Sequence, residues 1–422
     1  MKPDIISFSA LISACEQGGE WQLALAIFDR MPCESVRPNE ISWNAGISSC
    51  VKGGQWQAAL TLFHSMAGSK AAPNVVSFSA AITACKESGQ WQIALNLFEA
   101  MPESQVQPNV ITFSSMITAC ERCGRWQLAL IIFDEMPSAK VLPNAVSFGA
   151  AIGACEKGCQ PQQALTFLDS MVAASVGPDV VNWNAAFSSF RNSGQWHLAP
   201  TLLKTMQGAV LQPDVISFSS AISACEKAGQ WRIALGVFEG MQEARVQPNV
   251  VSWNAAISSC EKAGRWEIAI CLFAAASCAR IQTSAITWNA AISACQKGGR
   301  WEPALSLFEG MQGARVKPDI ISFSALISAC EQGGEWQLAL SAFEAMCEAH
   351  MQCNVVCFSS AISSLERAGQ WQQALSLFKA MPEAQVQPNI ISFDAAIRAC
   401  EQGRQPEFTL RLLDIVAGIP VS

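Results

Sequence analysis

The chain has 422 residues, and its composition is uneven: 14 Trp and 18 Cys stand beside 3 His and no Tyr. No apolar run reaches the roughly 18 residues that a membrane-spanning helix needs, so no membrane partner is expected. The formal charge of −7 and the pI of about 5.2 argue against a nucleic-acid partner that is held by a broadly basic surface.

One unit of 35 residues is copied along the chain. The segment 3–25 recurs identically at 318–340, an offset of nine times 35 residues. With repeat position 1 set at Ile5, eleven repeats occupy 5–389 and an incomplete twelfth occupies 390–422. Position 17 carries the tryptophans Trp21, Trp56, Trp91, Trp126, Trp196, Trp231, Trp266, Trp301, Trp336 and Trp371. A fixed period of this length predicts a repeat protein in which each unit packs only on its neighbours.

The first repeat, 5–39, contains two helical patterns. Ser7 is expected to cap the first helix and Gly18–Gly19 to end it. The apolar residues of this helix are spaced by three and four: Phe8, Leu11, Ile12 and Cys15. Those of the second helix are Trp21, Ala24, Leu25, Phe28 and Met31, with Pro32 or Pro38 preventing its continuation. Neither helix can bury its apolar face alone. The repeats are therefore predicted to stack into an all-α, right-handed solenoid superhelix of helix-turn-helix repeats with a concave inner surface.

Proline predicts one irregular repeat. Pro200 falls inside the second helix of the sixth repeat, where it would cost about 3 kcal/mol unless the helix kinks. Pro161 and Pro303 fall in the first turn of their helices, where proline is tolerated. We therefore expect a local irregularity near residue 200.

These helical hairpins, which end in Pro-Asn or Pro-Asp, resemble the pentatricopeptide repeat over residues 3 to about 415. The seventh repeat carries the core string V-I-S-F-S…C-E-K-A-G-Q-W…A-L…F-E-G-M…V-Q-P-N. Phe or Trp stands at position 4, where the family usually has Tyr, and Trp stands at position 17, where Leu is common. The tetratricopeptide repeat, which binds peptides, has a period of about 34 residues, and the absence of any slip to that period favours the first family.

The resemblance implies that each repeat reads one RNA base through positions 5 and 35. In repeat order, the base-reading residues are Ser9 and Asn39, Asn44 and Asn74, Ser79 and Asn109, Ser114 and Asn144, Gly149 and Asp179, Asn184 and Asp214, Ser219 and Asn249, Asn254 and Ser284, Asn289 and Asp319, Ser324 and Asn354, and Ser359 and Asn389. Asp394 stands at position 5 of the twelfth repeat without a partner at position 35. The alternative is that both positions cap helices, since Asn, Asp and Ser are favoured there.

Position 2 is implied to clamp the base from both sides. It carries Ile6, Ile41, Val76, Ile111, Val146, Val181, Ile216, Val251, Ile286, Ile321, Val356 and Ile391. All are β-branched and stiff at χ1, as a fixed apolar wall requires. The alternative is that these residues belong to the core.

The pairing of positions 5 and 35 predicts a sequence. Asp only accepts hydrogen bonds at neutral pH, which suits the N–H of uracil, whereas Asn suits adenine or cytosine. A short Ser at position 5 leaves room for a purine, and a longer Asn fills the space beside a pyrimidine. By the family's reading rule, with the protein N-terminus toward the RNA 5′ end, the resemblance implies the RNA 5′-ACAA?UACUAA-3′, with the atypical Gly149 and Asp179 repeat left open.

Basic residues recur at position 13, which faces the groove in this family. They are candidates for phosphate binding: Lys52, Arg122, Lys157, Lys227, Lys262, Lys297 and Arg367. Glu is frequent beside them at position 12, so the alternative is a solvated ridge of charges. We expect a shallow salt dependence, with fewer than about seven phosphates neutralised.

No motif predicts a catalytic, cofactor or metal site, so the chain is not expected to be an enzyme. Ten cysteines share position 11 on the apolar face of the first helix, where free Cys acts as a small hydrophobe. Cys120-x-x-Cys123 and the Cys353 and Cys357 pair lack the second half of a metal motif. His64, His197 and His350 share no repeat position.

We therefore predict sequence-specific binding of single-stranded RNA. The resemblance places this activity in organellar RNA processing, editing or stability, in a chloroplast or mitochondrion, although no transit peptide is visible. The alternative is a protein-binding scaffold. Because no polar cap is evident at either end of the chain, head-to-tail self-association, truncation or a separate effector protein is also expected.

Overall fold

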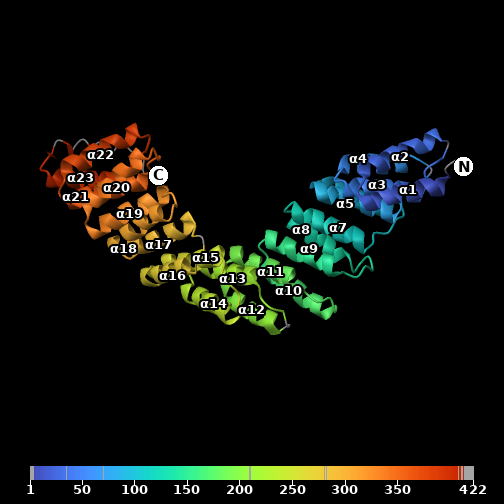
Figure 1. The fold of residues 1–422 in the computed structure, drawn as a ribbon, viewed down its shortest axis with the longest axis horizontal. Coiled ribbons are helices and arrows are strands. Elements are labelled where there is room, and N and C mark those ends of the chain that lie inside the picture. The colour runs from blue at the N-terminus through green and yellow to red at the C-terminus, as the bar shows by residue number, and fades with distance from the viewer. Residues whose placement is uncertain are drawn as a thin grey trace. The chain divides into compact units, whose positions relative to one another are not determined.

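A computed structural model describes residues 4–34, 36–69, 71–208, 211–279, 281, 283–406, 408–409 and 412, and every regular element within them is a helix. The chain forms two compact units, 1–213 and 214–422, and in each unit helix pairs stack side by side (Figure 1). None of the described helices is long and apolar enough to cross a bilayer. The prediction of an all-α protein built from helix-turn-helix repeats is confirmed.

The first unit consists of antiparallel helix pairs, and the two helices of each pair follow each other in the sequence. The first helices of its pairs are α1 (Ile5–Gly18), α3 (Glu40–Lys52), α5 (Val75–Ser88), α7 (Val110–Arg122), α9 (Ala145–Lys157) and α11 (Val180–Ser193). The second helices are α2 (Trp21–Cys33), α4 (Trp56–Ala67), α6 (Trp91–Glu103), α8 (Trp126–Glu135), α10 (Pro161–Ala173) and α12 (Ala199–Gly208), the last preceded by a 3₁₀ turn, η1 (Trp196–Leu198).

The second unit repeats the arrangement. The first helices of its pairs are α13 (Val215–Lys227), α15 (Val250–Lys262), α17 (Ala285–Lys297), α19 (Ile320–Gly333), α21 (Val355–Arg367) and α23 (Ile390–Gln402). The second helices are α14 (Trp231–Glu243), α16 (Trp266–Cys278), α18 (Trp301–Gly313), α20 (Trp336–Glu348) and α22 (Trp371–Glu383). Within each unit each first helix packs on the first helix of the next repeat, so α1 to α11 form one layer of odd-numbered helices and α13 to α23 form another.

Aromatic pairs join consecutive repeats in the core. The Phe28 ring of α2 lies 4.6 Å from the Trp43 ring of α3, and the Phe308 ring of α18 lies 4.8 Å from the Phe323 ring of α19. The same edge-to-face contact between positions 24 and 4 recurs along both units. Each such pair is worth about 0.5–1.5 kcal/mol beyond the area that it buries. Bulk at position 4, whether Phe or Trp, therefore holds neighbouring repeats together.

The prediction that Ser7 and its equivalents are helix N-caps is wrong. The cap lies three residues earlier, at position 35 of the preceding repeat: Ser42 N donates to Asn39 Oδ1 at 2.9 Å, and Asn39 N donates to Ser42 Oγ at 2.9 Å. Position 3 thus closes a reciprocal capping box with a hydroxyl in place of the more usual Glu or Gln. The predicted helix end at Gly18–Gly19 is confirmed, since Gly19 has a φ of 75°, a conformation that favours glycine.

The irregularity expected near residue 200 is present. The second helix of the sixth repeat begins with the 3₁₀ turn η1, and α12 begins at Ala199. Pro200 is thereby placed in the first turn of an α-helix, where a missing N–H costs no intrahelical hydrogen bond.

Candidate nucleic-acid interface

The residues at position 2 are exposed, not buried. In the first unit these are Ile6, Ile41, Val76, Ile111, Val146 and Val181, and in the second Ile216, Val251, Ile286, Ile321, Val356 and Ile391; we call them the position-2 rows. Their exposed fractions run from 51% to 73%. The alternative that they belong to the core is therefore wrong. Large apolar side chains exposed in every repeat make the position-2 rows a candidate interaction surface.

In the first unit the position-2 row borders a hollow of about 390 Å³ across α1, α3, α5 and α7. Val76 and Ile111 from position 2 line it, together with Ser79 from position 5 and Asn109 from position 35. Glu16 and Lys52, from positions 12 and 13, lie at the same hollow. Within these repeats the residue types proposed to clamp, to read bases and to contact phosphates therefore share one surface.

Position 35 has a structural duty that constrains its chemistry. Asn109 Oδ1 accepts the N–H of Thr112 at 2.9 Å as the N-cap of α7, and Asp319 Oδ1 accepts that of Ser322 at 2.9 Å as the N-cap of α19. One side-chain oxygen is thus committed to the helix. The second polar atom, Nδ2 of Asn or Oδ2 of Asp, decides whether the residue can donate to a ligand or only accept from it. The alternative, that these residues are caps, is correct for position 35, and it leaves the second polar atom outside the cap, although that atom of Asn74 donates to Glu40 at 3.3 Å.

Position 5 lies beside position 35 of the same repeat. Asn289 Nδ2 donates to Asp319 Oδ1 at 3.0 Å and to Oδ2 at 2.9 Å, and Asn44 Nδ2 donates to Asn74 Oδ1 at 3.4 Å. Ser9 Oγ lies 3.4 Å from Asn39 Oδ1. The side chains that the sequence pairs across 30 residues are therefore neighbours in these repeats.

The position-35 aspartate of the ninth repeat, Asp319, is held in its ionised form. Partial burial opposes ionisation of Asp319, but hydrogen bonds from Ser322 and Asn289 outweigh it and lower the pKa of the carboxyl group. Asp319 therefore accepts hydrogen bonds and donates none at neutral pH.

The serine side chains at position 5 are short and mostly buried. Ser9, Ser79, Ser114, Ser219 and Ser359 are 5–7% exposed, and Ser324 is half-buried. Each hydroxyl donates to the backbone carbonyl four residues earlier. A serine at this position therefore offers space and at most an acceptor, in contrast to the amide of Asn. In the twelfth repeat the exposed Asp394 is paired with Arg398 at 2.7 Å.

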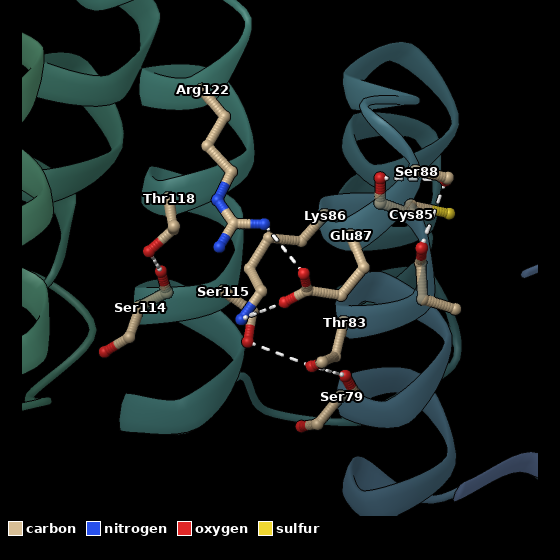
Figure 2. A network of polar contacts seen from close by, with 11 residues as sticks. Ser79, Thr83, Cys85, Lys86, Glu87, Ser88, Ser114, Ser115, Thr118 and Arg122 are labelled. Carbon is tan, nitrogen blue, oxygen red and sulfur yellow. Dashed lines mark hydrogen bonds and ion pairs between the residues drawn. The ribbon is translucent and has the colours of Figure 1, made fainter. Parts of the chain in front are cut away.

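Most of the candidate phosphate-binding cations are paired with carboxylates of the preceding repeat. Lys262 Nζ lies 2.7 Å from Glu226 Oε1, and Lys297 Nζ lies 2.7 Å from Glu261 Oε1. Lys52 pairs with Glu16 at 3.2 Å and Arg367 with Glu331 at 3.5 Å. Arg122 lies 2.7 Å from Glu87, which also contacts Lys86, so α5 and α7 are joined by a polar network (Figure 2). We call these contacts the inter-repeat ion-pair ladder.

The ladder changes the electrostatics expected of position 13. The cations are 41% to 55% exposed, so a phosphate can reach them, but it must compete with a carboxylate. Glu121 lies near Lys157. Burial raises the pKa of Glu121, and the positive charge of Lys157 partly offsets this rise. Lys227 is also engaged in a contact. The carboxylates are less exposed, at 17% to 24% for Glu16, Glu226, Glu261 and Glu331. The value of about 0–1 kcal/mol for an exposed pair is therefore a lower bound, because opening a pair leaves a mostly covered carboxylate without its cation.

The position-11 cysteines behave as small core residues. Burial raises the pKa of Cys50 to about 11 and that of Cys120 to about 12, so both are protonated thiols at neutral pH. Cys123 Sγ contacts the Gly89 carbonyl at 3.2 Å. Within the described part of the chain, His, Cys, Asp and Glu form no cluster of three or more that could hold a metal ion.

Sequence reasoning missed two features of this surface. Position 3 contacts position 5 of the preceding repeat: Ser79 Oγ lies 3.0 Å from Thr112 Oγ1, and Ser322 Oγ donates to Asn289 Oδ1 at 2.7 Å. Position 9 lines the hollow through Ser48 and Thr83. The available signal was the recurrence of Ser or Thr at position 3, except at Asn182 and Cys357, and at position 9, except at Gly153 and Arg398.

Three repeat profiles match the chain. The PPR repeat family matches at 38–87, 73–122 and 283–332, and the pentatricopeptide repeat domain at 1–53, 166–228, 201–262 and 341–402. The PPR repeat matches at 111–141, 251–275 and 321–351. No curated protein sequence matches the chain.

Among solved structures, the chain is similar to the pentatricopeptide repeat protein PPR10 from maize, with 17% identity, a TM-score of 0.46, and coverage of 98% of this chain and 74% of that one. PPR10 in complex with an 18-nucleotide psaJ RNA element gives 21% identity and a TM-score of 0.44, over 96% of this chain and 63% of that one. The PPR domain of Arabidopsis thaliana protein-only RNase P 1 in complex with tRNA gives 16% identity and a TM-score of 0.37, over 40% of this chain and 90% of that one.

Proposed function

Because this chain belongs to the pentatricopeptide-repeat family, we propose that it is a sequence-specific binder of single-stranded RNA and not an enzyme. Each repeat reads the edge of one base with positions 5 and 35, and within each unit the bases lie between consecutive members of the position-2 row. On the family resemblance alone, the target is an organellar transcript whose processing, editing or stability depends on the bound protein.

The exposure of the position-2 rows is the observation that carries this proposal. A β-branched residue repeated every 35 residues, at least 51% exposed in every described copy, serves no purpose in the core. Flat, unstacked bases need apolar walls of this kind, and RNA-binding proteins read single strands by splaying out and stacking their bases. The position-35 caps lie beside the rows, and most of them are half-buried.

The capping duty of position 35 supplies a physical basis for the code. When Oδ1 of Asn is held by the helix, only Nδ2 remains, and it donates to the ring nitrogen acceptor of adenine or cytosine. When Oδ1 of Asp is held, Oδ2 accepts the ring N–H of uracil. Among the described residues the buried Oδ1 of Asn44 has no hydrogen-bond partner, and the amino group of a cytosine would provide one.

The proposed RNA is 5′-ACAA?UACUAA-3′, read by repeats 1 to 11 in order. The exposed cations of the ion-pair ladder account for how an acidic protein can bind it, because a phosphate that reaches them shares each cation with its carboxylate and needs no broadly basic surface. The same ladder favours a second candidate, a protein-binding scaffold, since paired cations attract phosphates weakly and the position-2 rows would also suit an apolar peptide.

A titration by fluorescence anisotropy separates the two candidates. We expect the labelled RNA 5′-ACAANUACUAA-3′, with N an equal mixture of the four bases, to bind at least about tenfold more tightly than shuffled RNA of the same composition, a difference of about 1.4 kcal/mol. The plot of log K against log salt concentration should be no steeper than about −5, as fewer than seven phosphates on a single strand require. Equal affinity for both RNAs would contradict base reading by positions 5 and 35. If neither RNA binds, the result would favour the protein-binding scaffold.

A further inference from the structure

Two residues depart from the repeat pattern at positions that contact each other. Position 5 carries Ser, Asn or Asp in every repeat except the fifth, where it is Gly149. Position 3 carries Ser, Thr or Cys in every repeat except the sixth, where it is Asn182. Position 3 of one repeat meets position 5 of the repeat before it, so the two departures concern a single contact.

The structure brings the two departures together. A β-carbon added at Gly149 would lie 3.1 Å from Asn182 Oδ1, closer than most real contacts of a β-carbon. The amide of Asn182 therefore occupies the space that a position-5 side chain would otherwise fill. Asn182 is 6% exposed, and Asn289, which is a true position-5 residue, is 7% exposed.

Asn182 also lies beside the position-35 residue of the fifth repeat. Its backbone N–H donates to Asp179 Oδ1 at 2.8 Å, because Asp179 caps α11. The side chain of Asp179 is exposed, and its second oxygen is not the one that holds the cap. An amide and a carboxylate therefore lie side by side at the fifth repeat, as those of Asn289 and Asp319 do at the ninth. At the fifth repeat, however, the amide comes from the next repeat.

We propose that Asn182 replaces the missing position-5 side chain of the fifth repeat and makes that repeat select uracil. The inference rests on the proposed function. The amide fills the space beside the base and so favours a pyrimidine, and Asp179 accepts the ring N–H of uracil, which neutral cytosine lacks. Without Asn182, the bare Gly149 would leave room for purines and pyrimidines alike, and Asp179 would accept from guanine as well as uracil.

The test compares four RNAs, 5′-ACAANUACUAA-3′, with A, C, G or U at the fifth base. The wild-type protein should prefer U at that base by about tenfold. A base that cannot donate to Asp179 loses one hydrogen bond to a charged group, which is worth about 1.5 kcal/mol or more. Asn182→Ser, which restores the usual residue at position 3, should reduce the U preference over G to less than about threefold. The double variant Gly149→Asn/Asn182→Ser should restore it, because the amide then comes from position 5.

The ninth base is the internal control. Its U preference, read by Asn289 and Asp319, should be unchanged in all three proteins, and circular dichroism should show that they are folded. A preference for U at the ninth base but none at the fifth in the wild type, or a fifth-base preference that survives Asn182→Ser, would overturn the inference. Loss of preference at both bases in the wild type would instead overturn the proposed function.

A second and independent observation concerns the connection between α20 and α21. Position 34, before the cap, is proline at every other repeat boundary except at Thr283, but here it is Cys353. Cys347, at the end of α20, is exposed, and its Sγ lies 3.5 Å from that of the half-buried Cys353. Two thiols so close need little movement to be bridged.

We infer that Cys347 and Cys353 form a disulfide when a low-molecular-weight disulfide such as oxidised glutathione is present. The Cys347 thiolate attacks one sulfur of the oxidant and releases one thiolate. Cys353 then loses its proton and attacks the Cys347 sulfur, which releases the second thiolate of the oxidant. Two protein thiols are thereby oxidised to a disulfide, and one disulfide is reduced to two thiols. Burial and the neighbouring Cys347 raise the pKa of Cys353 to about 12, so the exposed Cys347 attacks first.

Mass spectrometry of the whole chain after treatment with oxidised glutathione tests this assignment. The peptides that contain Cys347 and Cys353 should be joined directly, whereas the exposed Cys271 and Cys278 should carry only glutathione. Cys353→Ser should leave glutathione trapped on Cys347. Glutathione on Cys347 of the wild-type protein without a bridge to Cys353 would overturn the inference, as would an unmodified Cys347.

Discussion

Exchanging Asn289 for Ser and Asp319 for Asn is expected to switch the preferred ninth base of the bound RNA from uracil to adenine. Asn289 Nδ2 now contacts both carboxylate oxygens of Asp319, at 3.0 and 2.9 Å. In the double variant the new Asn would keep its oxygen in the cap and turn an N–H donor toward adenine, while Ser would open space for the purine. Competition between two RNAs that differ only at base nine should show a reversal of about tenfold in each direction.

The controls for this exchange separate reading from folding. Asn and Asp are equally good N-caps, so Asp319→Asn alone should change the unfolding free energy by less than about 0.5 kcal/mol in a thermal or urea melt. Asn289 is 7% exposed and hydrogen-bonds Asp319 and Ser322, so Asn289→Ser should add a loss of about 1–2 kcal/mol. The first repeat, with Ser9 and Asn39, supplies the same residues in their natural setting. A variant that melts cooperatively, binds RNA and still prefers uracil at base nine would contradict the donor and acceptor argument.

Much of the fold was readable from the sequence because the repeat multiplies every local signal. The period fixed the hairpins, and Pro200 marked the irregular helix correctly. The N-cap was misplaced by three residues because Asn39 and Ser42 are both good caps, and only the extended backbone at Asn39, with φ of −101° and ψ of 176°, distinguishes them. The alternative that positions 5 and 35 are caps holds for position 35, and the structure was needed to show that its Oδ1 is the atom committed to the helix.

The candidate site was less predictable, for two physical reasons. A β-branched residue at position 2 fits the helical pattern of the core as well as that of an exposed wall, and packing of the neighbouring helix decides between them. Charges at positions 12 and 13 meet across repeats, as Glu226 and Lys262 do, and a pattern on one helix cannot reveal a partner on the next. The phosphate contacts of position 13 therefore remain part of the proposal, now in competition with the ladder.

The largest loss of binding is expected from charge in the position-2 row. Val76 and Ile111 line the hollow that also contains Ser79 and Asn109, and they are 51% and 58% exposed. In Val76→Asp/Ile111→Asp, the three bases that border these two residues lose an apolar wall, and two carboxylates face the RNA backbone. Stacking of one base on an aromatic side chain is worth about 1–3 kcal/mol, and we take the lower end of this range, about 1 kcal/mol, for each aliphatic wall. Anisotropy should therefore show RNA binding weakened by at least about 100-fold. Neither residue is buried, so the melting temperature should change little.

The matched control places the same charges on equally exposed apolar residues outside the row. Leu23 of α2 and Ile131 of α8 are 53% and 55% exposed and belong to second helices. Leu23→Asp/Ile131→Asp changes the net charge and the exposed apolar surface by similar amounts, so RNA affinity should fall less than about threefold if binding is local to the row. If both double variants weaken binding equally, the acidic charge of the whole protein is responsible. If neither does, the RNA does not pass between the position-2 residues, and their exposure must serve another partner.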